Sequence, residues 1–130
     1  MKKINCLILW VSLTLSMGAM AQGHHHGHGR RDCATSEQMR LTMQALEKES
    51  FDDRRIETAI LCVTLGHFCT DDLARMAKTF TFDDNRTKFL TYAYDYCVDR
   101  ENYYTLKDVF IFKMDYDKMM ETIHSRHHRR

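Results

Sequence analysis

The sequence contains no proline and only five glycines among its 130 residues. Because proline interrupts a helix and glycine weakens one, their scarcity favours long helical segments and excludes collagen-like or proline-rich chains. Hydrophobic residues make up 44% of the chain and charged residues 28%, which is typical of a folded globular protein. The length leaves room for one domain and excludes a multidomain enzyme.

The chain also lacks a strong charge of either sign. Nineteen Lys and Arg residues stand against 18 Asp and Glu residues, and the two kinds are interleaved through the middle of the sequence. Nucleic acid is therefore not an expected partner. Basic residues gather only at the C-terminal end, where residues 124–130 form a basic tail rich in His and Arg.

The first 21 residues have the pattern of a secretory signal peptide. Two lysines precede an apolar run over residues 6–15, and the segment closes with Ala19, Met20 and Ala21. This run is short for a transmembrane helix, and the small residues around Met20 predict cleavage after Ala21. We therefore expect export to the periplasm or the medium, without membrane insertion of the cleaved protein.

Apolar residues recur three and four positions apart in six stretches, which is the spacing of amphipathic helices. The stretches are 39–46, 56–63, 73–80, 89–97, 103–110 and 116–123. They predict an all-α fold, a compact bundle of about six short helices arranged as helical-hairpin repeats. The expected helical domain spans residues 33–123. It is preceded by a disordered His- and Gly-rich tail over residues 22–32.

A repeat with a period of 31 residues supports the hairpin arrangement. The run Ser-Phe-Asp-Asp at residues 50–53 returns as Thr-Phe-Asp-Asp at residues 81–84, and Arg55 returns as Arg86. A looser third copy begins at Phe112. Such a period is close to that of known helix-pair repeats.

Each copy of the motif also has the composition of a helix start. Ser50 and Thr81 are predicted N-caps, with Asp53 and Asp84 three residues later at the reciprocal position of a capping box. Acidic residues in a first turn also complement the helix dipole. Two alternatives for these carboxylates are an oxygen-ligand site such as one for calcium and a catalytic pair.

Four cysteines follow the predicted cleavage site: Cys33, Cys62, Cys69 and Cys97. An even number in an exported domain indicates first two disulfides, with three possible connectivities. Buried free thiols and a four-thiolate zinc site are the alternatives. The spacing of these cysteines does not fit the close pairs of typical zinc sites.

The N-terminal tail is a candidate site for a transition metal. Cleavage after Ala21 would give Gln22 a free amine and make His24 the third residue, an arrangement that binds copper or nickel through the amine, two backbone amides and an imidazole. His25, His26 and His28 add further ligands for copper, nickel or zinc. The alternative is a solvated tail, and the fold itself requires no cofactor. At the other end, His124, His127 and His128 are expected to belong to a solvated helix terminus.

From residue 49 to about residue 123, the sequence resembles a domain-of-unknown-function family found near the C-termini of exported Bacteroidetes proteins. The resemblance rests on the two repeated motifs at residues 50–53 and 81–86 and on Val98, Asp99, Asn102, Tyr103 and Tyr104. Arg100 stands where the pattern of the family has a proline. The resemblance implies a small, exported, all-helical domain, and it brings no catalytic residues.

Two functions remain open at this point. The first is a non-catalytic exported module, a monomer or weak oligomer, that binds a protein or a cell-envelope component through a helical surface. The second is a periplasmic metal-binding or metal-stress protein that uses the His-rich tail. The sequence contains neither a nucleophile elbow nor a glycine-rich phosphate loop, so we do not expect an enzyme.

Overall fold

The computed structural model describes residues 32–129, and in that range the chain is helical. The elements are α1 (Ser36–Glu47), α2 (Asp52–Leu65), α3 (Thr70–Ala77), α4 (Asp83–Ala93), the 3₁₀ segments η1 (Tyr94–Tyr96) and η2 (Arg100–Val109), and α5 (Lys113–His127). Across these residues the only β-type pairing is an isolated bridge between Phe68 and Cys97. The predicted all-α fold is confirmed.

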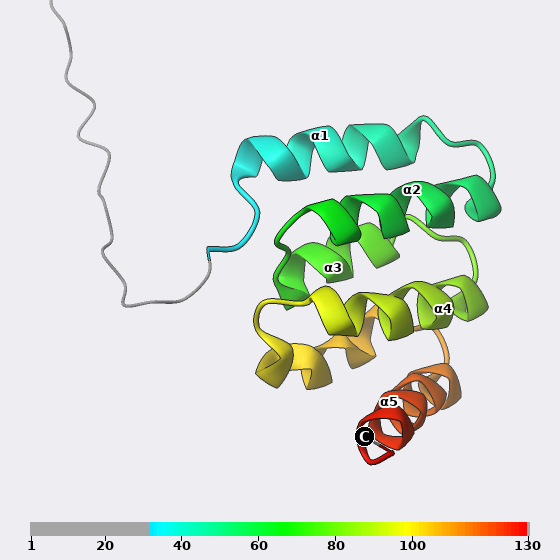
Figure 1. Ribbon diagram of the computed structural model, residues 1–130. Helices are drawn as coiled ribbons and strands as arrows, with labels where there is room; N and C mark the ends of the chain where they lie inside the picture. Colours follow the sequence, from blue (N-terminus) through cyan, green and yellow to red (C-terminus); the bar gives the residue numbers. More distant parts are fainter. Residues whose placement is uncertain (1–31, 130) are drawn as a thin grey trace, which may run out of the picture.

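The helices form two layers (Figure 1). In the front layer α1, α2, α4 and α5 follow one another from top to bottom, while α3 and η2 lie behind α2 and α4. Contacts between α1 and α2, α2 and α4, and α4 and α5 run along the front layer, and α3 contacts η2 in the back layer. Contacts of α3 with α1 and α4, and of η2 with α5, join the two layers. Each 31-residue unit thus supplies one front helix and one back segment, and α5 is the front helix of a third, incomplete unit.

The core consists of apolar side chains from every long element. Leu46, Phe80, Phe89 and Tyr103 are almost completely buried. Burying a side chain of this size stabilises the fold by about 1.5–3 kcal/mol. The hydroxyl of Tyr103 donates a hydrogen bond to the Leu90 carbonyl at 2.7 Å, and burial raises its pKa well above the ordinary value. The buried hydroxyl of Tyr103 therefore has a hydrogen-bond partner within the core.

The fifth predicted helix is a 3₁₀ helix rather than an α-helix. Its buried residues are Tyr103, Leu106 and Val109, which follow one another at steps of three. A 3₁₀ helix places residues three apart on one face, so this winding directs all three side chains into the core. An α-helix would rotate Val109 away from the face occupied by Tyr103.

Gly66 is the C-cap residue of α2, and it also leaves room for a neighbouring ring. A Cβ atom at this position would lie 2.5 Å from a ring carbon of Phe68. Phe68 is buried, so its ring has little space to move away.

At the other end of the chain, α5 continues to His127, so His124 belongs to the helix and not to a separate tail.

Candidate functional site

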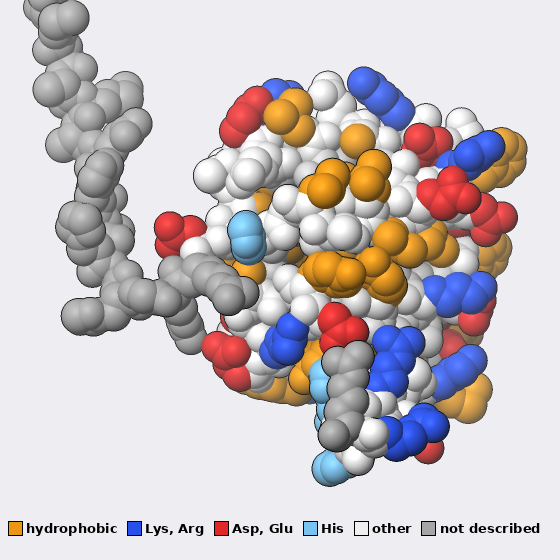
Figure 2. All heavy atoms as spheres, viewed as in Figure 1, with side chains coloured by type: hydrophobic (Ala, Val, Ile, Leu, Met, Phe, Trp, Pro, Cys, Tyr) orange, Lys and Arg blue, Asp and Glu red, His pale blue; other side chains and the backbone are white. Residues whose placement is uncertain are grey.

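The structure places an exposed phenylalanine at the start of each front helix that follows α1. Phe51, Phe82 and Phe112 are the N-cap residues of α2, α4 and α5, and their exposed fractions are 74%, 65% and 63%. We call these three side chains the phenylalanine row. Figure 2 shows hydrophobic side chains between charged ones along the right-hand margin, where α2 and α4 begin.

The predicted helix caps are wrong. The N-caps of α2 and α4 are Phe51 and Phe82, without a side-chain cap, rather than Ser50 and Thr81. Both phenylalanines have extended backbones and each following Asp already belongs to the first turn, so the hydroxyl residues lie one position outside the cap. Asp53 and Asp84 are exposed and do not form capping boxes.

The first aspartate of each motif turns inward and binds the next unit. The Asp52 carboxylate accepts hydrogen bonds from the Thr81 backbone N–H at 2.8 Å and from the Asn85 side chain at 3.0 Å. The Asp83 carboxylate accepts from the backbone N–H groups of Ile111 at 2.8 Å and Phe112 at 2.7 Å. Each carboxylate therefore fixes the chain beside the next phenylalanine of the row.

An arginine holds each of these carboxylates. Arg55 pairs with Asp52 at 2.6 Å and Arg86 pairs with Asp83 at 2.7 Å, and all four side chains are at most 14% exposed. Arg55 also donates to the carbonyls of Leu46, Glu49 and Thr79, which joins the end of α1 to the segment that follows α3. The motif is a structural joint between units, and its carboxylates are already engaged by donors of the chain.

The electrostatics agree with this role. Partial burial opposes ionisation of Asp52, but the hydrogen bonds from Asn85 and Thr81 and the charge of Arg55 outweigh it and lower the pKa of Asp52. On the exposed side of α4, Asp84 pairs with Lys88 at 2.7 Å, and this contact lowers the pKa of Asp84. The phenylalanine row is thus bordered by paired charges of both signs.

A second apolar feature is a groove of about 320 Å³ between α1 and α2. It is lined by Ala34, Gln38, Leu41, Thr42, Leu61, Cys62, Leu65, Gly66, His67 and Phe68. Leu41, Leu61 and Leu65 are at least half exposed, and Figure 2 shows hydrophobic side chains across α1, α2 and α4 on the viewed face. None of the lining residues is an acid, a lysine or an arginine.

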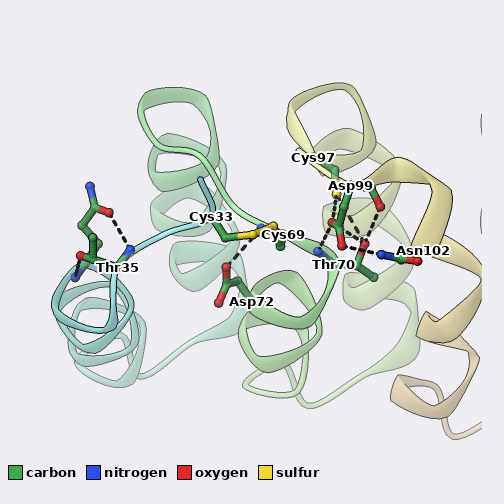
Figure 3. Close-up of a disulfide and its surroundings, with 9 residues drawn as sticks. Cys33, Thr35, Cys69, Thr70, Asp72, Cys97, Asp99 and Asn102 are labelled. Atoms are coloured by element: carbon green, nitrogen blue, oxygen red, sulfur yellow. Dashed lines mark hydrogen bonds between the residues drawn. A yellow bond between two sulfur atoms is a disulfide. The ribbon is translucent and has the colours of Figure 1, made fainter. Parts of the chain in front are cut away.

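The cysteines form one disulfide and leave two thiols. Cys33 is bonded to Cys69, while Cys62 and Cys97 are free (Figure 3). A second disulfide, the first interpretation of the sequence, is not formed. The two free thiols have different surroundings: Cys62 faces the groove, whereas Cys97 is buried between Thr70 and Asp99.

The surroundings of Cys97 form a polar cluster that joins the back segments. The Asp99 carboxylate accepts from the Thr70 backbone N–H at 2.6 Å and from the Asn102 side chain at 2.8 Å (Figure 3). Burial raises the pKa of the Cys97 thiol to about 11. The thiol therefore stays protonated at neutral pH, which makes it a poor nucleophile.

The predicted metal ligands of the tail, Gln22, His24, His25, His26 and His28, lie outside the described residues. In the described part of the chain, no group of three or more His, Cys, Asp or Glu side chains is placed to hold a metal ion. Of the C-terminal histidines, His127 lies 3.6 Å from Asp95 and packs against the ring of Tyr94. These contacts attach α5 to η1.

Sequence reasoning missed the inward role of Asp52 and Asp83 and the exposure of the phenylalanine row. The 31-residue repeat contained a usable signal, because it pairs each Asp with an Arg three residues later. On a helix this spacing brings the two side chains together. The spacing does not reveal that each Asp carboxylate also accepts hydrogen bonds from backbone N–H groups of the next unit.

The fold and these joints define a small helical-repeat domain. Residues 34–123 match the family described as Domain of unknown function (DUF4476), and the chain belongs to that family. No curated protein and no solved structure matches the chain significantly.

Among residues 32–129, no helix has the length and apolar character needed to cross a membrane. The disulfide is typical of proteins in oxidising compartments.

Proposed function

We propose that the protein is an exported, non-catalytic binding module that recognises a protein of the periplasm, cell surface or medium through the phenylalanine row. The observation that carries the proposal is the exposure of Phe51, Phe82 and Phe112 at equivalent positions of three units. Exposed aromatic side chains on rigid elements are typical anchors of protein interfaces. The joints through Asp52 and Asp83 hold the backbone at Phe82 and Phe112 before a partner arrives, which reduces the entropy lost on binding.

The proposal is tested by site-specific photo-crosslinking in cells that export the full chain. A benzophenone amino acid replaces Phe51, Phe82 or Phe112 in turn, and Leu61 of the groove serves as the matched exposed control. We expect the three row positions to crosslink to the same protein and position 61 to crosslink to it weakly. The interaction with that purified protein should weaken at least about tenfold when Phe82 is replaced by Ser, which is the effect of losing about 1.4 kcal/mol. Equal crosslinking from all four positions contradicts the proposal.

A second candidate function is the binding of copper, nickel or zinc in the periplasm. It is favoured by the place where the His-rich tail joins the domain, because the Cys33–Cys69 disulfide holds this point close to His67. The test is metal tolerance of cells in which His24, His25, His26 and His28 are replaced by Ala. Unchanged tolerance contradicts the second function and leaves the first intact.

A further inference from the structure

We propose that the surface around the groove between α1 and α2 is an interface between two copies of this chain, related by a two-fold axis. This surface consists of the groove and of three exposed leucines beside it, Leu41, Leu61 and Leu65, and we call it the leucine face. It lies apart from the phenylalanine row. The inference therefore concerns the assembly of the module and does not depend on what the row binds.

The first support is the apolar surface that the leucine face leaves in solvent. Leu41, Leu61 and Leu65 are 50%, 59% and 77% exposed, although α1 and α2 pack against each other. Towards α4 the surface continues without a charged side chain, because the Thr64 hydroxyl lies 3.3 Å from the Tyr92 hydroxyl. Figure 2 shows hydrophobic side chains across the middle of the viewed face and charged ones mainly near its margins. Contiguous exposed apolar surface of this kind is typical of an interaction site.

The second support is the charge of the leucine face, which favours a second copy over a different protein. None of the residues that line the groove is an acid, a lysine or an arginine, although such residues make up 28% of the chain. A two-fold axis places the same patch on both sides of the contact, so a charged side chain near the axis would meet its own like charge. Non-obligate interfaces between different proteins are about as polar as the general surface, whereas homodimer interfaces are more apolar. The lining of the groove has the composition of the second kind.

The third support is the shape of the leucine face, which contains both a groove and a side chain that protrudes beside it. The groove has a volume of about 320 Å³, and Leu65 at the end of α2 is 77% exposed. A two-fold axis allows Leu65 of each copy to enter the groove of the other, so that the two contacts form together. Both contacts remove apolar surface from water. The face is thus complementary to itself in shape as well as in charge.

A dimer through the leucine face leaves the phenylalanine row open. The row lies at the starts of α2, α4 and α5, whereas α2 lines the groove near its other end, through Leu61, Cys62 and Leu65. Phe51 and Leu65 are 14 residues apart along α2, which corresponds to about 21 Å. The dimer therefore carries two free rows, and this doubling strengthens binding to any partner that presents more than one copy of its own site.

The test measures the mass of the full exported chain by sedimentation equilibrium over a wide range of concentrations. We expect the mass to rise reversibly from one chain to two. Leu65→Lys should raise the dissociation constant of the dimer at least about tenfold, because it places a cation against an apolar groove. Met114→Lys is the matched control: Met114 is also 77% exposed but lies in α5, so this variant should dimerise like the native chain. Cys62→Ser cannot form a disulfide between copies and should dimerise as well.

Three results of this experiment would overturn the interface. They are a mass of one chain at every concentration, a dimer that Leu65→Lys leaves intact, and a dimer that Met114→Lys weakens equally or Cys62→Ser abolishes. A second measurement needs no variant: alkylation of Cys62 in the native chain should slow as the protein concentration rises, because the second copy covers the groove, and a constant rate also overturns the interface. A benzophenone amino acid at position 61 should crosslink one copy to another whatever the row binds, so failure of the dimer and failure of the row are distinguishable.

Discussion

The Asp83 carboxylate accepts a hydrogen bond from the backbone N–H of Phe112 across 2.7 Å and 29 residues of sequence. This bond fastens the first turn of α4 to the start of α5. One unit earlier, the Asp52 carboxylate accepts a hydrogen bond from the N–H of Thr81 at 2.8 Å, which corresponds to the bond that Asp83 accepts from Ile111. A short-range sequence motif thus produces a long-range joint, and this joint fixes the backbone beside an exposed phenylalanine.

Loss of the Asp83 joint should destabilise the whole domain. In Asp83→Ala, Arg86 remains almost buried without its partner, and two backbone donors lose their acceptor. We expect the free energy of unfolding to fall by about 3–5 kcal/mol, measured by urea denaturation. The control is Asp84→Ala, an exposed residue in the same turn, which should change stability by about 0.5 kcal/mol or less. Similar losses in both variants would refute the joint.

Stability should fall in acid because two joints depend on ionised carboxylates. The pKa values of Asp52 and Asp99 are lowered in the folded state, so the unfolded chain binds more protons as the pH falls. This contribution is complete above the ordinary Asp value near pH 4 and is lost as the pH falls through the lower folded values. Urea denaturation between pH 7 and pH 3 should show a shallower decline for Asp52→Asn than for the native chain. Parallel curves would contradict the role of Asp52.

Two phenylalanines that are two residues apart should differ strongly in what the same substitution does to stability. Phe80 is 1% exposed and Phe82 is 65% exposed. Phe80→Ala should lower the free energy of unfolding by about 3–5 kcal/mol, because it leaves a cavity in the core. Phe82→Ala should change it by about 0.5 kcal/mol or less while reducing partner binding. A large loss of stability in Phe82→Ala would show that the row is a packing element.

Reduction of the disulfide should lower stability without abolishing the fold. Cys33 and Cys69 are 36 residues apart, and a crosslink of that span constrains the unfolded chain by about 3–4 kcal/mol. We expect the free energy of unfolding to fall by this amount in Cys33→Ser, measured by denaturant titration. Added reductant should then have no further effect on the variant. A further loss would indicate a second disulfide.

The two free thiols should react at very different rates in the native protein. Cys62 lines an open groove, whereas the Cys97 thiol is buried and its pKa is raised to about 11. At pH 8 only about one Cys97 thiol in a thousand is ionised, since each pH unit below the pKa reduces the thiolate tenfold. A thiol reagent should therefore modify one cysteine in the native protein and two after unfolding. Rapid modification of both in the native state would contradict the burial of Cys97.

Periodicity predicts the helices of this fold because each front helix buries one stripe of side chains. It fails for residues 100–109, where spacing by three and spacing by four are both present and the core selects the 3₁₀ winding through Tyr103, Leu106 and Val109. Helix-start composition misled the cap prediction, because Ser50 and Thr81 resemble caps locally while Asp52 and Asp83 have partners about 29 residues away. Local patterns do not record such partners. The even number of cysteines predicted a disulfide. Which two cysteines pair could not be predicted, because it depends on the fold bringing Cys33 next to Cys69, 36 residues further along the chain.

The third copy of the motif differs from the first two at the positions that form a joint. After Phe112 it has Lys113 where the earlier copies have Asp, and Tyr116 where they have Arg. At the start of α5 the exposed ammonium group of Lys113, whose side chain is 82% exposed, therefore replaces the inward-facing carboxylate of the earlier copies. The acceptor that Asp52 and Asp83 provide for the start of the following unit is therefore missing from α5. The carboxylate network that links successive units runs in one direction, from each unit to the next, and stops at the start of α5.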